Sequence, residues 1–205
     1  MKEVKLTFHN NGLRSYIDMD LCSQCPRQDD KGCCGYYSPV FYPSDFAYLT
    51  QYQPELLEEI LSLSQITVLD ASVTVNHTVE APGYHCHFHN TEGGCRLPQL
   101  MRESVCRHFV CPGITWEQDE KFKHWQYFFS RLSDYEIELN NKISEQLKSE
   151  GLSLRNLENR SFFFKRVLEI FNKETAVMPE FINKLNKEES LTLACEIKYG
   201  EDWTL

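Results

Sequence analysis

The sequence lacks an apolar run long enough to cross a membrane, and its N-terminus lacks the apolar stretch of a secretory signal. It is also poor in basic residues, since 21 Lys and Arg against 30 Asp and Glu give a net charge of −9 at pH 7. Because such a chain repels phosphate backbones, we expect no binding to nucleic acid. Phosphate-binding loops, dinucleotide fingerprints and Ser-His-Asp patterns are absent as well. These absences predict a cytoplasmic protein that binds neither membranes nor nucleic acid.

Cysteine is the residue that the chain has in excess. Eight of the nine cysteines lie between Cys22 and Cys111, and only Cys195 follows them. A reducing compartment disfavours disulfides, so this clustering favours metal ligation over a disulfide framework. Cys195 stands apart from the cluster, and we expect it to be a small apolar residue of the core.

The eight cysteines form two groups of four. The first group is Cys22, Cys25, Cys33 and Cys34, and the second is Cys86, Cys95, Cys106 and Cys111. A Cys-x-x-Cys turn brings two sulfurs to one side, where they can hold one ion. Neighbouring side chains diverge, so the adjacent pair Cys33 and Cys34 favours two metals, or two atoms of one cluster. Eight thiolates supply two four-ligand sites, and the spacing leaves their partition open.

The identity of the metal also stays open at the level of the sequence. Zinc suits tetrahedral sites of four thiolates and Cys-x-x-Cys pairs. Iron–sulfur chains often carry C-x-x-C-x-x-C, which is absent here, but widely spaced cysteines also hold such clusters. The sequence therefore predicts zinc or a 4Fe–4S cluster, with a slight preference for zinc.

Basic side chains and imidazoles accompany the second group. Three arginines are expected either to donate N–H groups to sulfur and balance the charge of the centre, or to be solvated surface residues: Arg96, Arg102 and Arg107. Four histidines are expected to be surface or core residues, with metal ligation as the alternative: His85, His87, His89 and His108.

The pattern as a whole resembles the YkgJ-type cysteine-cluster family, whose members are described as zinc- or iron-chelating domains. The matching stretches are Cys22 to Cys34, Cys86-His87-Phe88, Gly94-Cys95, and Arg102 to Arg107. Two features depart from the family pattern: seven residues precede Cys33 where three are usual, and Glu103 stands where the family has proline. Flagellin lysine methylases carry a similar cluster on longer chains, so the resemblance also implies protein lysine methylation as an alternative activity.

Hydrophobic periodicity outlines the expected fold. Val4, Leu6 and Phe8 alternate as in a strand, and a helix is expected from Thr115, where a T-x-x-Q capping box begins, to Gly151. Further segments are expected to be helices over 44–52, from Pro54, and over 153–173, 179–187 and 189–199, with extended chain over 66–81. The predicted fold is mainly α with a few short strands: an irregular, metal-organised cysteine-rich half over 1–113, followed by a helical half over 114–205 that packs on it.

Two function classes follow from these features. The first is a metal-binding protein that acts in metal handling, electron transfer or partner recognition, with a protein partner meeting the helical half. The second is an enzyme whose zinc or cluster supports redox or group-transfer chemistry. A catalytic zinc needs an open coordination position, and eight candidate ligands leave none evident, so the first class is favoured.

Overall fold

The structure is a computed structural model that describes residues 2–22, 37–80, 83–90, 94–111 and 114–195. The chain forms two compact units, each assembled from separate stretches of sequence. Unit 1 comprises 1–38, 77–131 and 180–205, and unit 2 comprises 39–76 and 132–179. The domain boundary predicted at residue 113 stays a prediction. The two compact units divide the chain differently, since each contains residues from before and after position 113.

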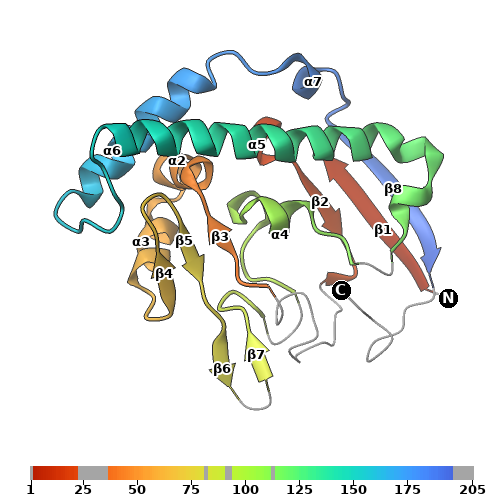
Figure 1. The fold of residues 1–205 in the computed structure, drawn as a ribbon. Helices are drawn as coiled ribbons and strands as arrows, with labels where there is room; N and C mark the ends of the chain where they lie inside the picture. Colours follow the sequence, from red (N-terminus) through yellow and green to blue (C-terminus); the bar gives the residue numbers. More distant parts are fainter. Residues whose placement is uncertain (1, 23–36, 81–82, 91–93, 112–113, 196–205) are drawn as a thin grey trace. The chain divides into compact units, whose positions relative to one another are not determined.

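Unit 1 is built on a three-stranded antiparallel sheet in the order β2-β1-β8, which Figure 1 shows with β1 in the middle. The strands are β1 (Lys2–His9), β2 (Tyr16–Met19) and β8 (Glu188–Cys195). β1 pairs with β8 along its whole length, from Lys2 opposite Cys195 to His9 opposite Glu188. The remaining elements of unit 1 are η1 (Gly12–Arg14), β6 (Thr78–Glu80), β7 (Gly83–His85), η3 (Gln99–Met101), α4 (Ser104–His108), η4 (Trp116–Gln118), η5 (Glu120–Phe122) and α7 (Glu180–Asn183).

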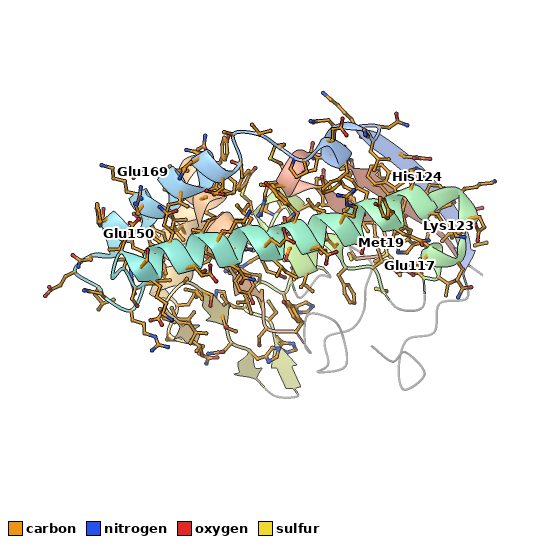
Figure 2. All side chains as sticks on the ribbon, turned by 45° about the horizontal axis from the view of Figure 1, so that its top comes forward. Met19, Glu117, Lys123, His124, Glu150 and Glu169 are labelled. Carbon is orange, nitrogen blue, oxygen red and sulfur yellow. The ribbon has the colours of Figure 1, made fainter. Side chains whose placement is uncertain are left out.

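The core of unit 1 is an aromatic cluster on one face of the sheet. The ring of Phe8, which is fully buried, stacks on Trp125 at 5.3 Å and lies 4.9 Å from the Trp116 ring. The Trp125 Nε1–H donates to the Glu189 carboxylate at 2.7 Å, so the buried indole keeps a polar partner on β8. His124, labelled in Figure 2, lies in the first turn of α5 (Lys123–Ser149). Its Nε2 is 2.8 Å from the same carboxylate. These contacts tie α5 to the edge strand of the sheet.

Unit 2 combines a small sheet with helices. Its strands lie in the antiparallel order β3-β5-β4, and α5 contributes its residues from Leu132 onward. The elements are β3 (Val40–Phe41), α2 (Pro43–Tyr52), α3 (Pro54–Ser62), β4 (Ile66–Val68), β5 (Val73–Val75) and α6 (Arg160–Glu174). α2 packs on α6, where the rings of Phe46 and Phe164 meet edge to face at 5.5 Å. The backbone N–H of Ser44 in the first turn of α2 donates to Asn140 Oδ1 on α5 at 2.8 Å.

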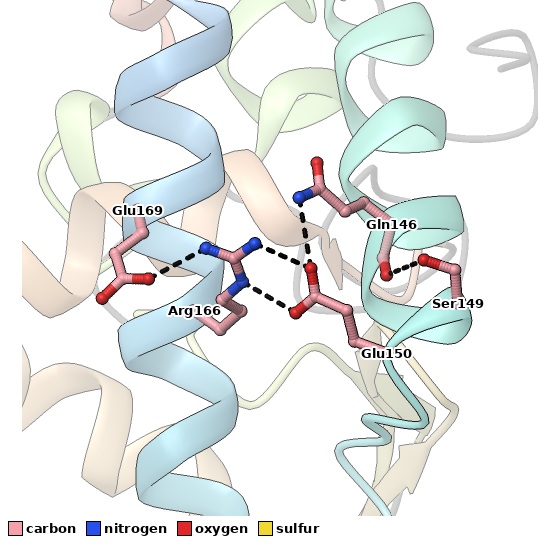
Figure 3. A network of polar contacts seen from close by, with 5 residues as sticks. All are labelled: Gln146, Ser149, Glu150, Arg166 and Glu169. Carbon is pink, nitrogen blue, oxygen red and sulfur yellow. Dashed lines mark hydrogen bonds and ion pairs between the residues drawn. The ribbon is translucent and has the colours of Figure 1, made fainter.

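A polar network joins the end of α5 to α6 in unit 2 (Figure 3). The Arg166 guanidinium donates to both carboxylate oxygens of Glu150 at 2.7 Å and to Glu169 at 3.0 Å. The Gln146 amide donates to Glu150 as well, at 3.2 Å. These bonds lower the pKa of Glu150 from 4.5 to about 2, and the hydrogen bonds from Arg166 have the largest effect. The ionised form of Glu150 is therefore the one that the folded unit favours.

The substitution Glu150→Gln should make the stability of the protein less dependent on pH in the acid range. Since the pKa of Glu150 is lower in the folded protein, its contribution is complete above pH 4.5 and is lost as the pH falls from 4.5 to about 2. Urea titrations at pH 7 should show the wild type as more stable than the variant, and at pH 2 the two should converge. Glu145→Gln, an exposed change on the same helix, is the matched control; an equal gap between wild type and Glu150→Gln at both pH values would contradict this assignment.

The predicted fold class is wrong in both halves. Residues before 113 contribute strands and helices to packed cores, with Val4, Leu6 and Phe8 fully buried, and do not form an irregular half organised by metal. The later half is not all helical, because the stretch expected to be a helix over 189–199 forms strand β8 as far as Cys195. Hydrogen bonding along the whole of β1 outweighs the helix propensity of this Glu- and Leu-containing stretch.

The expected start of the long helix is also corrected. The Thr115 side chain makes no capping hydrogen bond, and two short 3-10 turns precede the helix, which begins at Lys123. The helix over 153–173 is shorter than expected and begins at Arg160, and that over 179–187 is reduced to α7. The strand at 4–8, both helices around Pro54 and the extended chain after residue 66 are confirmed, and the first two strands of that extended stretch pair antiparallel.

Candidate metal centre

All of the cysteines belong to unit 1, and the sequence of unit 2 contains none. The five cysteines of the cluster whose placement is described carry thiols and not disulfides: Cys22, Cys86, Cys95, Cys106 and Cys111. Cys25, Cys33 and Cys34 lie outside the described residues. The structure therefore describes five of the eight predicted cysteine ligands, and their geometry follows.

A tight loop presents Cys86 and Cys95. Cys86 follows strand β7, and its carbonyl accepts a hydrogen bond from the His89 N–H at 2.9 Å. The chain then returns, so that His89 and Cys95 face each other in an antiparallel bridge. The Phe88 side chain is buried and anchors the loop. Two cysteines with eight residues between them in the sequence thereby lie at the two ends of one turn.

The chain at Cys22 approaches the second cysteine group at Gly94. This glycine has a φ of 77°, and a Cβ there would lie 3.0 Å from the Cys22 carbonyl oxygen and 3.8 Å from the Cys22 Cβ. A side chain at position 94 would therefore suffer both backbone strain and a clash. The Gly-Cys pair at 94–95 lets the chain that carries Cys22 approach the loop closely, which no spacing rule in the sequence predicts.

Cys106 is presented by the short helix α4. The Glu103 carboxylate, 1% exposed, caps this helix by accepting hydrogen bonds from the N–H groups of Cys106 at 2.8 Å and Val105 at 2.9 Å. Burial raises the pKa of the Cys106 thiol, and Glu103 raises it further, as do Cys86 and Cys95. Because Cys86 and Cys95 both affect the pKa of Cys106, the three thiols lie within electrostatic range of one another. Glu103, which departs from the proline of the resembled family, is thus the residue that orients the first turn of α4.

The described thiols share a region without forming a complete site. Within the ranges that the structure describes, no three Cys, His, Asp or Glu side chains lie close enough together to hold a metal ion. The donor set of Cys22, Cys86, Cys95 and Cys106 is nevertheless chemically uniform, and thiolates suit zinc and iron–sulfur clusters. Residues of this kind fit such a group, and Cys111 follows α4 in the same unit.

The three arginines beside the second group have different surroundings. The Arg96 guanidinium lies over the Phe88 ring, 5.2 Å from its centroid, and the Arg102 Nε–H donates to the Leu97 carbonyl at 2.9 Å. Arg107 is fully buried and donates to the carbonyls of Leu13 and Ser15. A buried Arg14 joins this arrangement, and no signal in the sequence indicates its role, because a single arginine in a turn has no distinguishing pattern.

The histidines around Cys86 lie close to one another. The rings of His85 and His89 stack at 5.5 Å, and His87 meets the Phe88 ring edge-on at 5.4 Å. Burial lowers the pKa of His89, and the neighbouring His85 lowers it further. Burial also lowers the pKa of His108 well below its usual range. Both side chains are thus favoured in the neutral form, which is the form that ligates metals.

Comparison with known proteins gives no relative for this chain: no family model, no curated protein and no solved structure matches it. Among the helices of the described residues, none has both the length and the apolar character that a membrane span requires.

Proposed function

We propose that this protein binds zinc or an iron–sulfur cluster through its cysteine cluster and acts in metal handling, electron transfer or partner recognition. The proposed ligands are Cys22, Cys25, Cys33, Cys34, Cys86, Cys95, Cys106 and Cys111. The observation that supports this most strongly is the approach of Cys22, from the first sequence group, to Gly94, the neighbour of Cys95 in the second.

The chemistry of the surroundings supports the same proposal. Cys86 and Cys95 come from a loop and Cys106 from a helix, yet both loop cysteines raise the pKa of the Cys106 thiol. Because free thiolate ligands persist in a reducing compartment, we propose that the protein belongs to the cytoplasm. The net charge of −9 supports the absence of nucleic acid among its partners, and we propose a protein partner for the helical residues after 114.

Anaerobic purification followed by elemental analysis and visible absorption tests the proposal. A brown protein with acid-labile sulfide would identify an iron–sulfur centre, and a colourless protein with about two zinc ions per chain would identify zinc sites of four thiolates each. A chain that stays free of both metals after reconstitution with zinc, or with iron and sulfide, would contradict the proposal. Substrate turnover that disappears with the metal would instead favour an enzyme of the redox or group-transfer class.

A further inference from the structure

Two buried arginines reach across unit 1 in opposite directions. Arg107, on α4, donates from its guanidinium to the carbonyls of Leu13 at 2.9 Å and Ser15 at 2.8 Å. Arg14 donates in return to the carbonyls of Leu100 and Arg102, each at 2.6 Å. The Arg102 carbonyl also accepts from the Arg107 Nε–H at 3.2 Å, so both guanidinium groups meet on one oxygen. We call Arg14 and Arg107 the arginine latch.

The latch joins the two parts of the chain that carry the thiols. Arg107 is the neighbour of Cys106, whereas Arg14 lies two residues before the start of strand β2, which leads to Cys22. A weaker contact runs parallel to it, because the Gln99 amide donates to the Ile17 carbonyl on β2 at 3.2 Å. α4 and η3 both pack on β2. The latch therefore fixes where α4 lies along β2.

The strength of the latch comes from burial. Arg107 is 0% exposed and Arg14 is 7% exposed, so neither guanidinium can exchange these carbonyls for water. Hydrogen bonds from charged donors are stronger than neutral ones, and a buried carbonyl that loses its donor stays costly. All of these bonds end on backbone carbonyls and none involves a thiol, so none of them requires a bound metal.

We infer that Arg14 and Arg107 are positioning residues that hold the Cys22 and Cys106 parts of the chain together before metal binds. This inference rests on the proposed metal-binding function. Its consequence is that metal meets thiols whose backbone is already arranged, so the latch determines how many thiols each bound ion engages. Partners outside the ligand shell commonly alter metal affinity in this way.

Cobalt(II) titration of the full-length, reduced apoprotein tests the inference. Cobalt replaces zinc in thiolate sites, and the intensity of its sulfur-to-metal charge-transfer band rises with the number of bound thiolates. Arg107→Met and Arg14→Met should each bind cobalt roughly 10–100-fold more weakly in competition with a chelator, with a weaker band per bound ion at saturation. Arg131→Met is the matched control, since this exposed arginine of unit 1 lies over the Phe181 ring of α7.

The band intensity per bound ion separates positioning from a purely structural role. A purely structural arginine would lower the unfolding temperature but leave the saturated spectrum unchanged, and that result would overturn the inference. If the methionine variants do not fold, Arg107→Lys and Arg14→Lys keep the charge but lose the Nε–H bonds to the Arg102 and Leu100 carbonyls, and they should show the same change in smaller degree. A wild-type chain that binds neither cobalt nor iron with sulfide would overturn the proposed function itself, whereas binding that is identical in wild type and folded latch variants would overturn the latch alone.

Discussion

Replacing Cys106 with serine is expected to remove about half of the bound metal, whereas Cys195→Ser should leave the metal content unchanged. A serine hydroxyl does not ionise near neutral pH and cannot replace a thiolate ligand. Cys106 lies in the neighbourhood of Cys86 and Cys95, and one lost ligand in a four-thiolate site disables that site. Cys195 ends β8, which β1 separates from β2 and the chain that continues to Cys22.

Two strand spacings amount to roughly 10 Å, which is too far for β2 and β8 to share one ion. Metal content per chain, measured on protein purified without oxygen, checks both substitutions. Serine at position 95 should behave as it does at position 106, because Cys95 and Cys106 contribute to the same electrostatic neighbourhood. Equal metal loss from Cys195→Ser and Cys106→Ser would contradict the ligand assignment.

Removal of the metal should loosen the cysteine-bearing segments of unit 1 and leave unit 2 intact. Structural metal sites contribute on the order of 10 kcal/mol to folding, and this free energy can act only where the ligands are. Unit 2 contains no cysteine and has its own core, in which Phe46, Leu49, Ile60 and Val167 are 0% exposed. Its contribution to stability should therefore survive the loss of metal.

Hydrogen exchange with reductant present, so that disulfides cannot form, measures this difference. Amide protection should fall in 83–90 and 94–111 and persist in α2, α6 and the part of α5 beyond Leu132. The holoprotein under the same conditions is the control. Equal loss of protection in both units would mean that unit 2 depends on the metal, and unchanged protection everywhere would mean that metal does not stabilise this fold.

The sequence predicts elements well where the decisive contacts are local. Alternation of Val4, Leu6 and Phe8 marks β1, and Pro54 at a helix start marks α3, because both signals depend on neighbouring residues. The sequence does not predict strand β8, because β8 is stabilised by pairing with β1 at the other end of the chain. The start of α5 is not predicted for a related reason, since the turns before it hold Trp116 and Phe122 against Phe8.

The candidate site shows the same limit. Cysteine spacing indicates which residues are candidate ligands, yet it contains no information about the approach of Cys22 to Gly94. Glu103 reads in the sequence as a departure from a motif, and only its capping of Cys106 gives it a role. The role of Arg14 cannot be predicted from the sequence either. Its partners, the carbonyls of Leu100 and Arg102, are brought to it by tertiary packing and not by a local pattern.

On the ribosome, β1 emerges about 180 residues ahead of the strand that covers its second edge. At typical elongation rates of about 5–20 residues per second, that edge stays uncovered for roughly 10–40 s. Unpaired strand edges are sites of aggregation, so the nascent chain is at its most vulnerable during this interval. The cysteines up to Cys111 have all emerged before β8 is made, so metal capture can precede closure of the sheet. If the proposed site binds metal, cellular metal supply would then influence the yield of folded protein as well as the occupancy of that site.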